Sequence, residues 1–118
     1  MKNTAIFNLM PNEILNEVPK LYANENIKKW DTKVYAIYIV PGFSWTWYLT
    51  EYDGKDLAYG LVAGAFVEWG YFSLRELRKI GARRFTLISL PKTFKKLKDI
   101  ELVNNLSDDE MIKAFYEN

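Results

Sequence analysis

The sequence predicts an α+β fold: an antiparallel β-meander of four to five strands with short helices packed on one face. Trp45, Trp47 and Leu49 alternate with hydroxyl-bearing residues, which is the period of a half-buried strand. The Asp-Gly pair at Asp53 follows and favours a tight hairpin turn. Downstream, Ser73 and a Glu three residues later form a capping box, which marks the start of a helix. This order of elements is typical of a small sheet that packs against helices.

The length and composition indicate one globular domain over residues 1–118. Hydrophobic residues make up 49% of the chain and aromatic residues 16%, which supplies enough apolar area for a packed core. Because Cys and His are both absent, the sequence excludes disulfides, thiolate or imidazole catalysis, and metal sites built from His or Cys. We therefore expect a protein that is not an enzyme and that needs neither a cofactor nor a metal.

The sequence also predicts a cytoplasmic protein without a membrane partner. No apolar run approaches the roughly 20 residues that a membrane span needs. The first residues lack the apolar stretch and the small-residue cleavage site of a signal peptide.

The first third of the chain predicts a short helix, a loop and a central strand. Pro11 suits the first helical position, and Pro19 interrupts any continuous helix. Residues 24–31 are polar and predict a loop. Residues 33–40 are β-branched and aromatic at odd and even positions alike, which favours a central strand covered on both faces.

Residues 57–62 predict the partner strand of the hairpin, and residues 66–71 predict the next strand after a second tight turn. Gly60 lies inside the first of these strands and predicts a bulge or a close backbone approach, beneath a Trp ring. Gly81 predicts the left-handed end of the helix that begins at Ser73.

The C-terminal part predicts one more strand and two more helices. Residues 84–90 predict the strand, and residues 91–97 predict a short helix with Phe94 and Leu97 directed inward. A second capping box precedes an acidic terminal helix over residues 107–117.

Charge is unevenly distributed along the chain, although the net charge is only +1. Residues 75–98 hold nine bases and one acid, whereas residues 99–118 hold six acids and one base. The basic segment permits an anionic partner, and the equally weighted alternative is that the acidic tail folds over it and neutralises it. For nucleic-acid binding the candidate residues are Arg83, Arg84, Lys92, Lys95 and Lys96.

Aromatic residues are concentrated between Trp45 and Tyr71, and strand alternation cannot place all of them in one core. Trp45 and Trp47 are expected to anchor the core. Tyr48 and Tyr52 have the opposite parity and are the better candidates for a binding surface, because exposed Tyr is favoured at interfaces.

The central carboxylates allow one enzymatic hypothesis. Glu51 and Glu68 lie on different predicted strands and would act as a catalytic pair if they met across the sheet. Asp53 and Asp56 flank the predicted turn, where Asp is favoured for local hydrogen bonds to the backbone.

The central stretch resembles an uncharacterised family of small bacterial, plasmid and phage proteins known only as a domain of unknown function. The resemblance covers about residues 18–80. It rests on five motifs with matching spacing, namely Val-Pro-Lys-Leu-Tyr at 18–22, Ser-Trp-Thr-Trp-Tyr at 44–48, Glu-Tyr-Asp-Gly at 51–54, Gly-Leu-Val-Ala-Gly at 60–64 and Gly-Tyr-Phe-Ser-Leu-Arg-Glu-Leu at 70–77. It implies a shared fold and a mobile-element context, and it brings no activity.

Together these observations favour a non-enzymatic binding module of a mobile genetic element or phage. A concrete version is an accessory or anti-defence protein that binds a host protein or nucleoprotein complex and sterically blocks a host nuclease. The alternatives are direct nucleic-acid binding through the basic segment at residues 83–98 and a carboxylate enzyme that uses Glu51 and Glu68.

Overall fold

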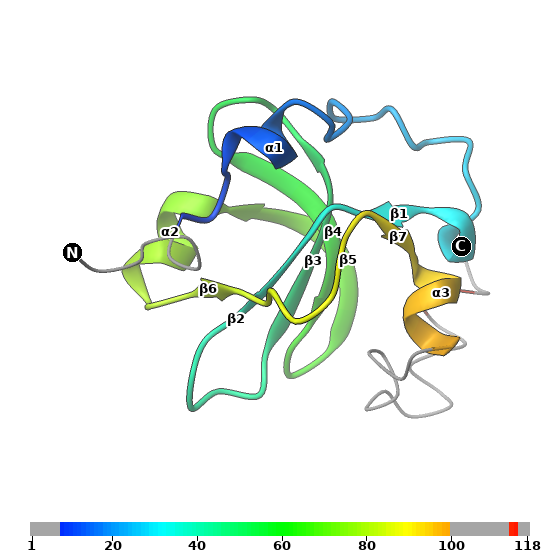
Figure 1. Cartoon of the computed structure of the whole chain (residues 1–118). Helices are drawn as coiled ribbons and strands as arrows, with labels where there is room; N and C mark the ends of the chain where they lie inside the picture. The colour runs from blue at the N-terminus through cyan, green and yellow to red at the C-terminus, as the bar shows by residue number, and fades with distance from the viewer. Residues whose placement is uncertain (1–7, 100–113, 116–118) are drawn as a thin grey trace.

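The computed structural model describes residues 8–99 and 114–115, and it confirms the α+β class (Figure 1). Its main body is a five-stranded antiparallel sheet in the order β5-β4-β3-β2-β6. These strands are β2 (Ala36–Ile39), β3 (Thr46–Tyr52), β4 (Leu57–Ala63), β5 (Val67–Ser73) and β6 (Arg83–Arg84). A separate two-stranded sheet pairs β1 (Lys33–Val34) with β7 (Lys92–Thr93). The helical elements are α1 (Asn12–Leu15), the 3-10 turn η2 (Lys29–Asp31), α2 (Leu74–Lys79) and α3 (Phe94–Asp99).

The predicted hairpin turn at Asp53 and Gly54 is confirmed. Gly54 lies between β3 and β4 and has a φ of +85°. A residue with a side chain would adopt this backbone conformation only at an energetic cost. One carboxylate oxygen of Asp53 accepts the backbone N–H groups of Lys55, Asp56 and Leu57 at 2.7–3.0 Å. Burial raises the pKa of Asp53, but these three hydrogen bonds outweigh burial, so the pKa lies below its ordinary value.

The predicted cap of α2 is confirmed, and Asp56 adds to it. The Ser73 hydroxyl accepts the N–H of Glu76 at 3.1 Å, as expected of an N-cap. The same hydroxyl donates to Asp56, whose other oxygen accepts the N–H of Arg75 at 2.8 Å. The hairpin turn and the start of α2 are therefore held together by hydrogen bonds. At the other end of the helix, Gly81 has a φ of +86°, as predicted.

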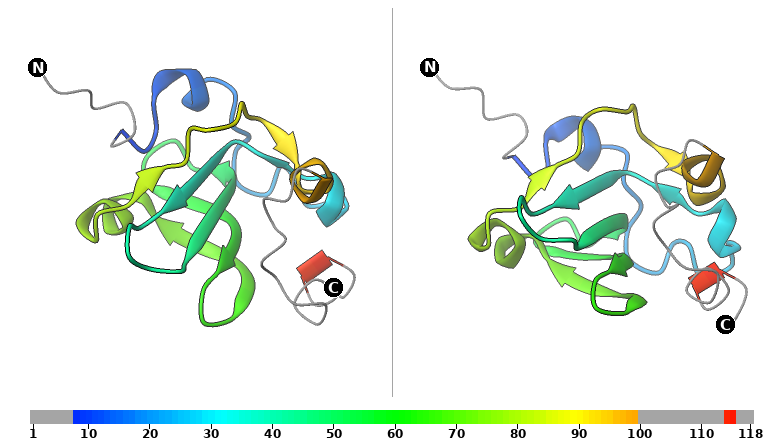
Figure 2. Two further views of the ribbon diagram at one scale, coloured as in Figure 1. Left: turned by 60° about the horizontal axis from the view of Figure 1, so that its bottom comes forward. Right: turned by 90° about the horizontal axis from the view of Figure 1, so that it is seen from below.

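Helices pack on both faces of the large sheet rather than on one face as predicted (Figure 2). On one face, here called the α2 face, Leu74 and Leu77 of α2 pack with residues such as Leu49. On the opposite face, here called the α3 face, Phe94 and Leu97 of α3 pack around residues such as Tyr48.

A β-bulge in β3 decides which side chains reach each face. Leu49 pairs with Gly60, but the next pair is Glu51 with Tyr59, so Thr50 is the additional residue. Before the bulge, odd-numbered residues of β3 face α2. After it, Tyr52 pairs with Ala58 and lies on the α2 face, while Glu51 lies on the α3 face.

Two predicted strands differ in length from those observed. The strand predicted over 33–40 is divided at Tyr35, because its first part pairs with β7 and its second part pairs with β3. The strand predicted over 84–90 is reduced to β6, because the chain must leave β2 and cross to the small sheet to place β7 beside β1 (Figure 1).

Of the acidic helix predicted over 107–117, only residues 114 and 115 lie within the described residues, and both are helical and buried.

We expect Gly60→Ala to destabilise the fold strongly. A Cβ at Gly60 would overlap the carbonyl oxygen of Tyr48 on the neighbouring strand, and backbone atoms cannot move aside cheaply. Denaturant unfolding should report a loss of about 2–3 kcal/mol. Gly70 is the matched control, because it pairs with Gly60 across the sheet and a Cβ there meets nothing within 4 Å. Equal losses for the two variants would contradict the close approach at Gly60.

We expect the contribution of Asp56 to stability to disappear in acid. The hydrogen bond from Ser73, followed by the bond from Arg75 N–H, lowers the pKa of Asp56 from its ordinary 3.8. A lowered pKa in the folded state means that the stabilisation is complete above 3.8 and is lost as the pH falls through the folded-state value. Asp56→Ala should therefore cost about 1 kcal/mol of unfolding free energy at pH 7, and less as the solution is acidified. The exposed Asp31, replaced by Ala, serves as the control for a general loss of charge.

Candidate functional site

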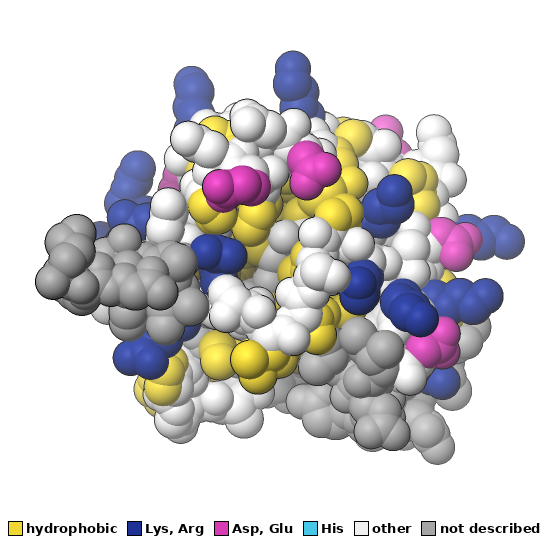
Figure 3. Space-filling model, in the orientation of Figure 1, with side chains coloured by type: hydrophobic (Ala, Val, Ile, Leu, Met, Phe, Trp, Pro, Cys, Tyr) yellow, Lys and Arg dark blue, Asp and Glu magenta, His cyan; other side chains and the backbone are white. Residues whose placement is uncertain are grey.

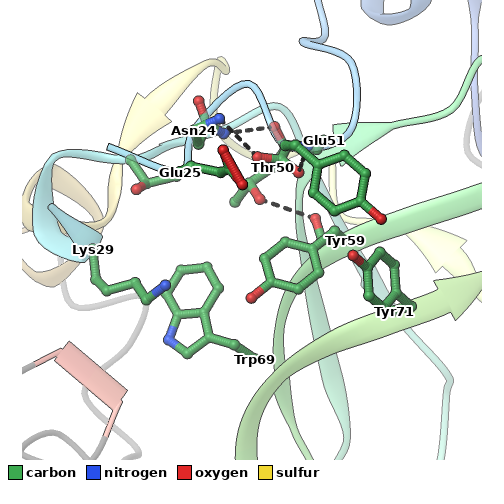
Figure 4. Close-up of a pocket in the computed structure, with 10 residues that line it drawn as sticks. Asn24, Glu25, Lys29, Thr50, Glu51, Tyr59, Trp69 and Tyr71 are labelled. Carbon is green, nitrogen blue, oxygen red and sulfur yellow. Dashed lines mark hydrogen bonds between the residues drawn. The ribbon is translucent and has the colours of Figure 1, made fainter. Parts of the chain in front are cut away.

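A pocket with a volume of about 350 Å³ lies on the α3 face, between the sheet and the loop that precedes η2 (Figure 4). Such a volume falls in the lower range of small-ligand sites. Strands β3, β4 and β5 contribute one wall, and residues 22–32 contribute the other. The lining residues are Tyr22, Asn24, Glu25, Lys29, Thr32, Thr50, Glu51, Tyr59, Trp69 and Tyr71.

Glu51 connects the two walls of this pocket. Its two carboxylate oxygens accept the backbone N–H groups of Tyr22 at 2.8 Å and Asn24 at 2.9 Å. The Asn24 side chain adds a hydrogen bond to the carbonyl of Thr50 at 3.3 Å. Glu51 is only 4% exposed, and among the described residues it has no basic partner. The loop is therefore fixed to the sheet by a buried carboxylate.

Tyr22 has a strained backbone conformation at this point of attachment. Its φ of +73° lies in the left-handed region, which is uncommon for a bulky residue and persists where surrounding contacts impose it. The Tyr22 side chain is exposed and shares a hydrogen bond with the hydroxyl of Tyr71. That bond is the largest cause that raises the pKa of Tyr71 to about 12, and the nearby charge of Glu51 contributes as well.

Three aromatic rings form the sheet wall of the pocket. The ring centroid of Tyr59 lies 6.1 Å from that of Trp69 and 5.0 Å from that of Tyr71. The Trp69 indole N–H donates to the carbonyl of Ala114 at 2.8 Å, which fixes the orientation of the ring. The Lys29 ammonium lies 4.6 Å from the centroid of Trp69, within the range of a cation–π contact (Figure 4).

A second surface feature is formed by the loops at one end of the sheet. Phe43 is 67% exposed, Trp45 42% and Phe66 73%. The loops that carry them are adjacent, because Thr46 pairs with Ala63. Trp45 was expected in the core, but its ring lies over Gly64, where a Cβ would come within 2.5 Å of the ring carbons. We call Phe43, Trp45 and Phe66 the hairpin-tip patch.

The expectation that Tyr48 and Tyr52 are exposed is wrong. Tyr48 is 2% exposed and packs against Phe94, because α3 covers the face that was expected to be open. Tyr52 is 7% exposed and lies on the opposite face from Tyr48, because the bulge at Thr50 reverses the alternation. Neither side chain is available as a surface anchor.

The basic candidates do not form one continuous strip. Arg83 and Arg84 lie on β6 at the edge of the large sheet, whereas Lys92, Lys95 and Lys96 belong to β7 and α3 on the other side of the molecule (Figures 1 and 2). Arg84 donates to the carbonyl of Asn8 at 2.7 Å, and Lys92 donates to Ser89 at 3.2 Å. Basic side chains are scattered around the face shown in Figure 3, with acidic groups among them.

The structure separates the proposed catalytic pair. Glu51 pairs with Tyr59 on the α3 face, whereas Glu68 pairs with Val62 on the α2 face. Their carboxylates therefore lie on opposite sides of the sheet and cannot act on one substrate. The carboxylate-enzyme hypothesis does not survive this geometry. The described residues also contain no group of three or more acidic side chains placed to hold a metal ion.

Sequence reasoning found the aromatic-rich stretch that holds the sheet wall, but it singled out other residues of that stretch and missed the opposite side of the pocket. Tyr59, Trp69 and Tyr71 are recognisable as strand aromatics. Tyr22, Asn24 and Lys29 belong to a polar loop with no local motif, and the contact that places them spans 29 residues in sequence.

Comparisons with known proteins give no match for the chain. No protein-family model, no curated protein and no solved structure matches it. Within the described ranges, no helix has the length and apolar character needed to cross a membrane.

We expect Glu51→Ala to release the loop and to destabilise the protein. The variant leaves the N–H groups of Tyr22 and Asn24 without their acceptor, and a charged hydrogen bond of this kind is worth about 1.5–3 kcal/mol. Amide hydrogen exchange at residues 22 and 24 should accelerate. Glu68→Ala is the matched control, since Glu68 is exposed on β5 of the same sheet and should change stability by at most about 0.5 kcal/mol. Unchanged exchange in the Glu51 variant would contradict the proposed attachment.

Proposed function

We propose that this protein is a non-enzymatic binding module that docks on a partner protein through the hairpin-tip patch. The observation that carries this proposal is the exposure of Phe43, Trp45 and Phe66 on two adjacent loops. Monomeric proteins rarely expose several large aromatic side chains together, and such patches are typical of interaction sites. Aromatic residues are also the side chains that most often dominate binding energy at interfaces.

Trp45, one residue of the hairpin-tip patch, is held in place by its neighbours. The Trp45 ring lies on Gly64 and 5.7 Å from the ring of Trp47, which is itself buried. A side chain that is fixed before binding loses less conformational entropy when the partner arrives. This arrangement favours a stable complex over a transient contact.

The biological setting is part of the same proposal. The resemblance of residues 18–80 to proteins of bacteria, plasmids and phages supports a mobile-element protein in the cytoplasm. The absence of Cys and His, together with the separation of Glu51 from Glu68, supports action by binding rather than by catalysis. We propose that the partner is a host protein or nucleoprotein complex, and that docking sterically blocks a defence nuclease.

We expect the paired change Phe43→Ser and Phe66→Ser to abolish partner capture. Tagged protein should retain a host protein from lysate, and loss of two anchors of this type should weaken capture by at least about tenfold. Leu87→Ser is the matched control, because Leu87 is the most exposed large apolar residue described and lies outside the patch. Equal capture by the patch variant and the control would exclude the patch as the docking surface.

The same preparation tests the nucleic-acid alternative. If Lys92, Lys95 and Lys96 bind a phosphate backbone, an oligonucleotide mobility shift should appear at low salt and weaken steeply as salt is added. Their replacement by Ala should then remove the shift while capture through the patch persists. If the mobility shift is salt-sensitive and no protein is captured, nucleic-acid binding would replace protein docking as the proposed function.

A further inference from the structure

The pocket on the α3 face is a second site, distinct from the hairpin-tip patch. We propose that it binds the cationic group of an organic ligand, an ammonium or a guanidinium. The cation lies against the rings of Tyr59 and Trp69 near the Glu51 carboxylate, and it displaces the Lys29 ammonium from Trp69. This inference does not depend on the proposed docking function.

The buried charge of Glu51 is the first argument. A carboxylate that is 4% exposed is costly unless hydrogen bonds and an opposite charge compensate it. Two backbone N–H groups provide the hydrogen bonds, whereas Lys29, the base among the residues that line the pocket, lies over the ring of Trp69. A ligand cation in the adjacent pocket supplies what is missing.

The aromatic wall is the second argument. The faces of Tyr and Trp rings carry negative electrostatic potential, and cages of such rings recognise ammonium groups. Tyr59 lies between Trp69 and Tyr71, so the three rings present one continuous surface (Figure 4). Trp69 is held in position without a ligand. Its indole N–H donates to Ala114, and its ring centroid lies 5.3 Å from that of Phe94.

Lys29 is the third argument, because it already shows the interaction that the ligand would make. Its ammonium lies 4.6 Å from the centroid of Trp69 and belongs to the lining of the pocket. A lysine side chain is long and flexible, so it can turn into solvent when a ligand arrives. Lys29 therefore acts as an internal competitor of the ligand.

The charges of the pocket disfavour an anionic ligand. Two acids, Glu25 and Glu51, line it against the single base Lys29. An anion would have to approach the Glu51 carboxylate, which cannot move away because it holds two backbone N–H groups. A neutral ligand would gain nothing from that charge.

Two sources of the cation can be distinguished with small probes. Choline represents a free quaternary ammonium compound, and 3,3-dimethylbutanol is its neutral isostere. N-acetyl-arginine amide represents a side chain of a peptide partner, and N-acetyl-citrulline amide is its neutral isostere. Each probe is titrated into the full-length protein. NMR follows the backbone amide signals of Tyr59, Trp69 and Tyr71 and the indole N–H signal of Trp69.

We expect saturable shifts at these residues with at least one charged probe, with a dissociation constant in about the millimolar range for fragments of this size. The charged probe with the lower dissociation constant identifies the source of the cation. The proposal is overturned if neither charged probe causes a saturable shift, or if the neutral isosteres cause the same shifts.

A variant of Lys29 should bind the charged probe more tightly, whereas a general loss of structure would weaken binding. Lys29→Gln removes the internal competitor, so it should tighten binding of the charged probe by about two- to fivefold. Lys28→Gln is the matched control, since it makes the same change in net charge one residue earlier and outside the pocket lining. Unchanged or weaker binding of the charged probe after Lys29→Gln would show that Lys29 does not compete with it for Trp69, and would overturn the proposal.

A second pair of variants separates the ring from its hydroxyl. Tyr59→Phe keeps the aromatic face and should retain binding, whereas Tyr59→Leu should reduce it at least about threefold. Equal losses would show that the hydroxyl binds the probe, contrary to the proposal. The docking function is tested separately, because Phe43→Ser with Phe66→Ser leaves the pocket intact and should leave probe binding unchanged.

Discussion

The bulge at Thr50 sets the chemistry of both faces of the large sheet. Without it, Glu51 would lie on the α2 face among Leu49, Leu74 and Leu77, where a carboxylate has no donors. With it, Glu51 reaches the backbone N–H groups of the 22–24 loop, while Tyr52 takes the apolar position on the other side. A single additional residue in β3 thus determines where the loop attaches and where the pocket opens.

Coverage of both sheet faces concentrates the functional surface in two places. The α2 face is filled by the residues that pack on α2, and most of the α3 face is filled by the cluster around Phe94. The hairpin-tip patch remains accessible at the end of the sheet, and the pocket remains accessible on the part of the α3 face that α3 does not cover. The two sites are built from different loops, so each can be altered while the other is kept.

Local sequence signals predicted the local structure well. The Asp53 turn, the Ser73 cap and the left-handed Gly81 were each found because one short motif supplies the whole interaction. Long-range effects were not predictable in the same way. The reversal of Tyr52 depends on an unmarked bulge, and the burial of Tyr48 depends on α3, which follows more than 40 residues later in the chain. The loop residue Tyr22 carries no motif that connects it with Glu51. The rings of the pocket wall belong to an aromatic-rich stretch that was visible in the sequence, but which of its rings line a pocket was not.

The distribution of contacts along the chain has a consequence for the order of assembly. Strands β2 to β5 are neighbours in sequence as well as in the sheet, so each pair closes a short loop at a small entropic cost. The bonds from residues 22 and 24 to Glu51 must instead close loops of 29 and 27 residues, and β1 meets β7 across an even longer span. The meander can thus form before the pocket exists, because the bonds that attach the 22–24 loop close longer loops. A ligand that binds both the loop and the sheet would therefore stabilise an attachment that forms later than the meander.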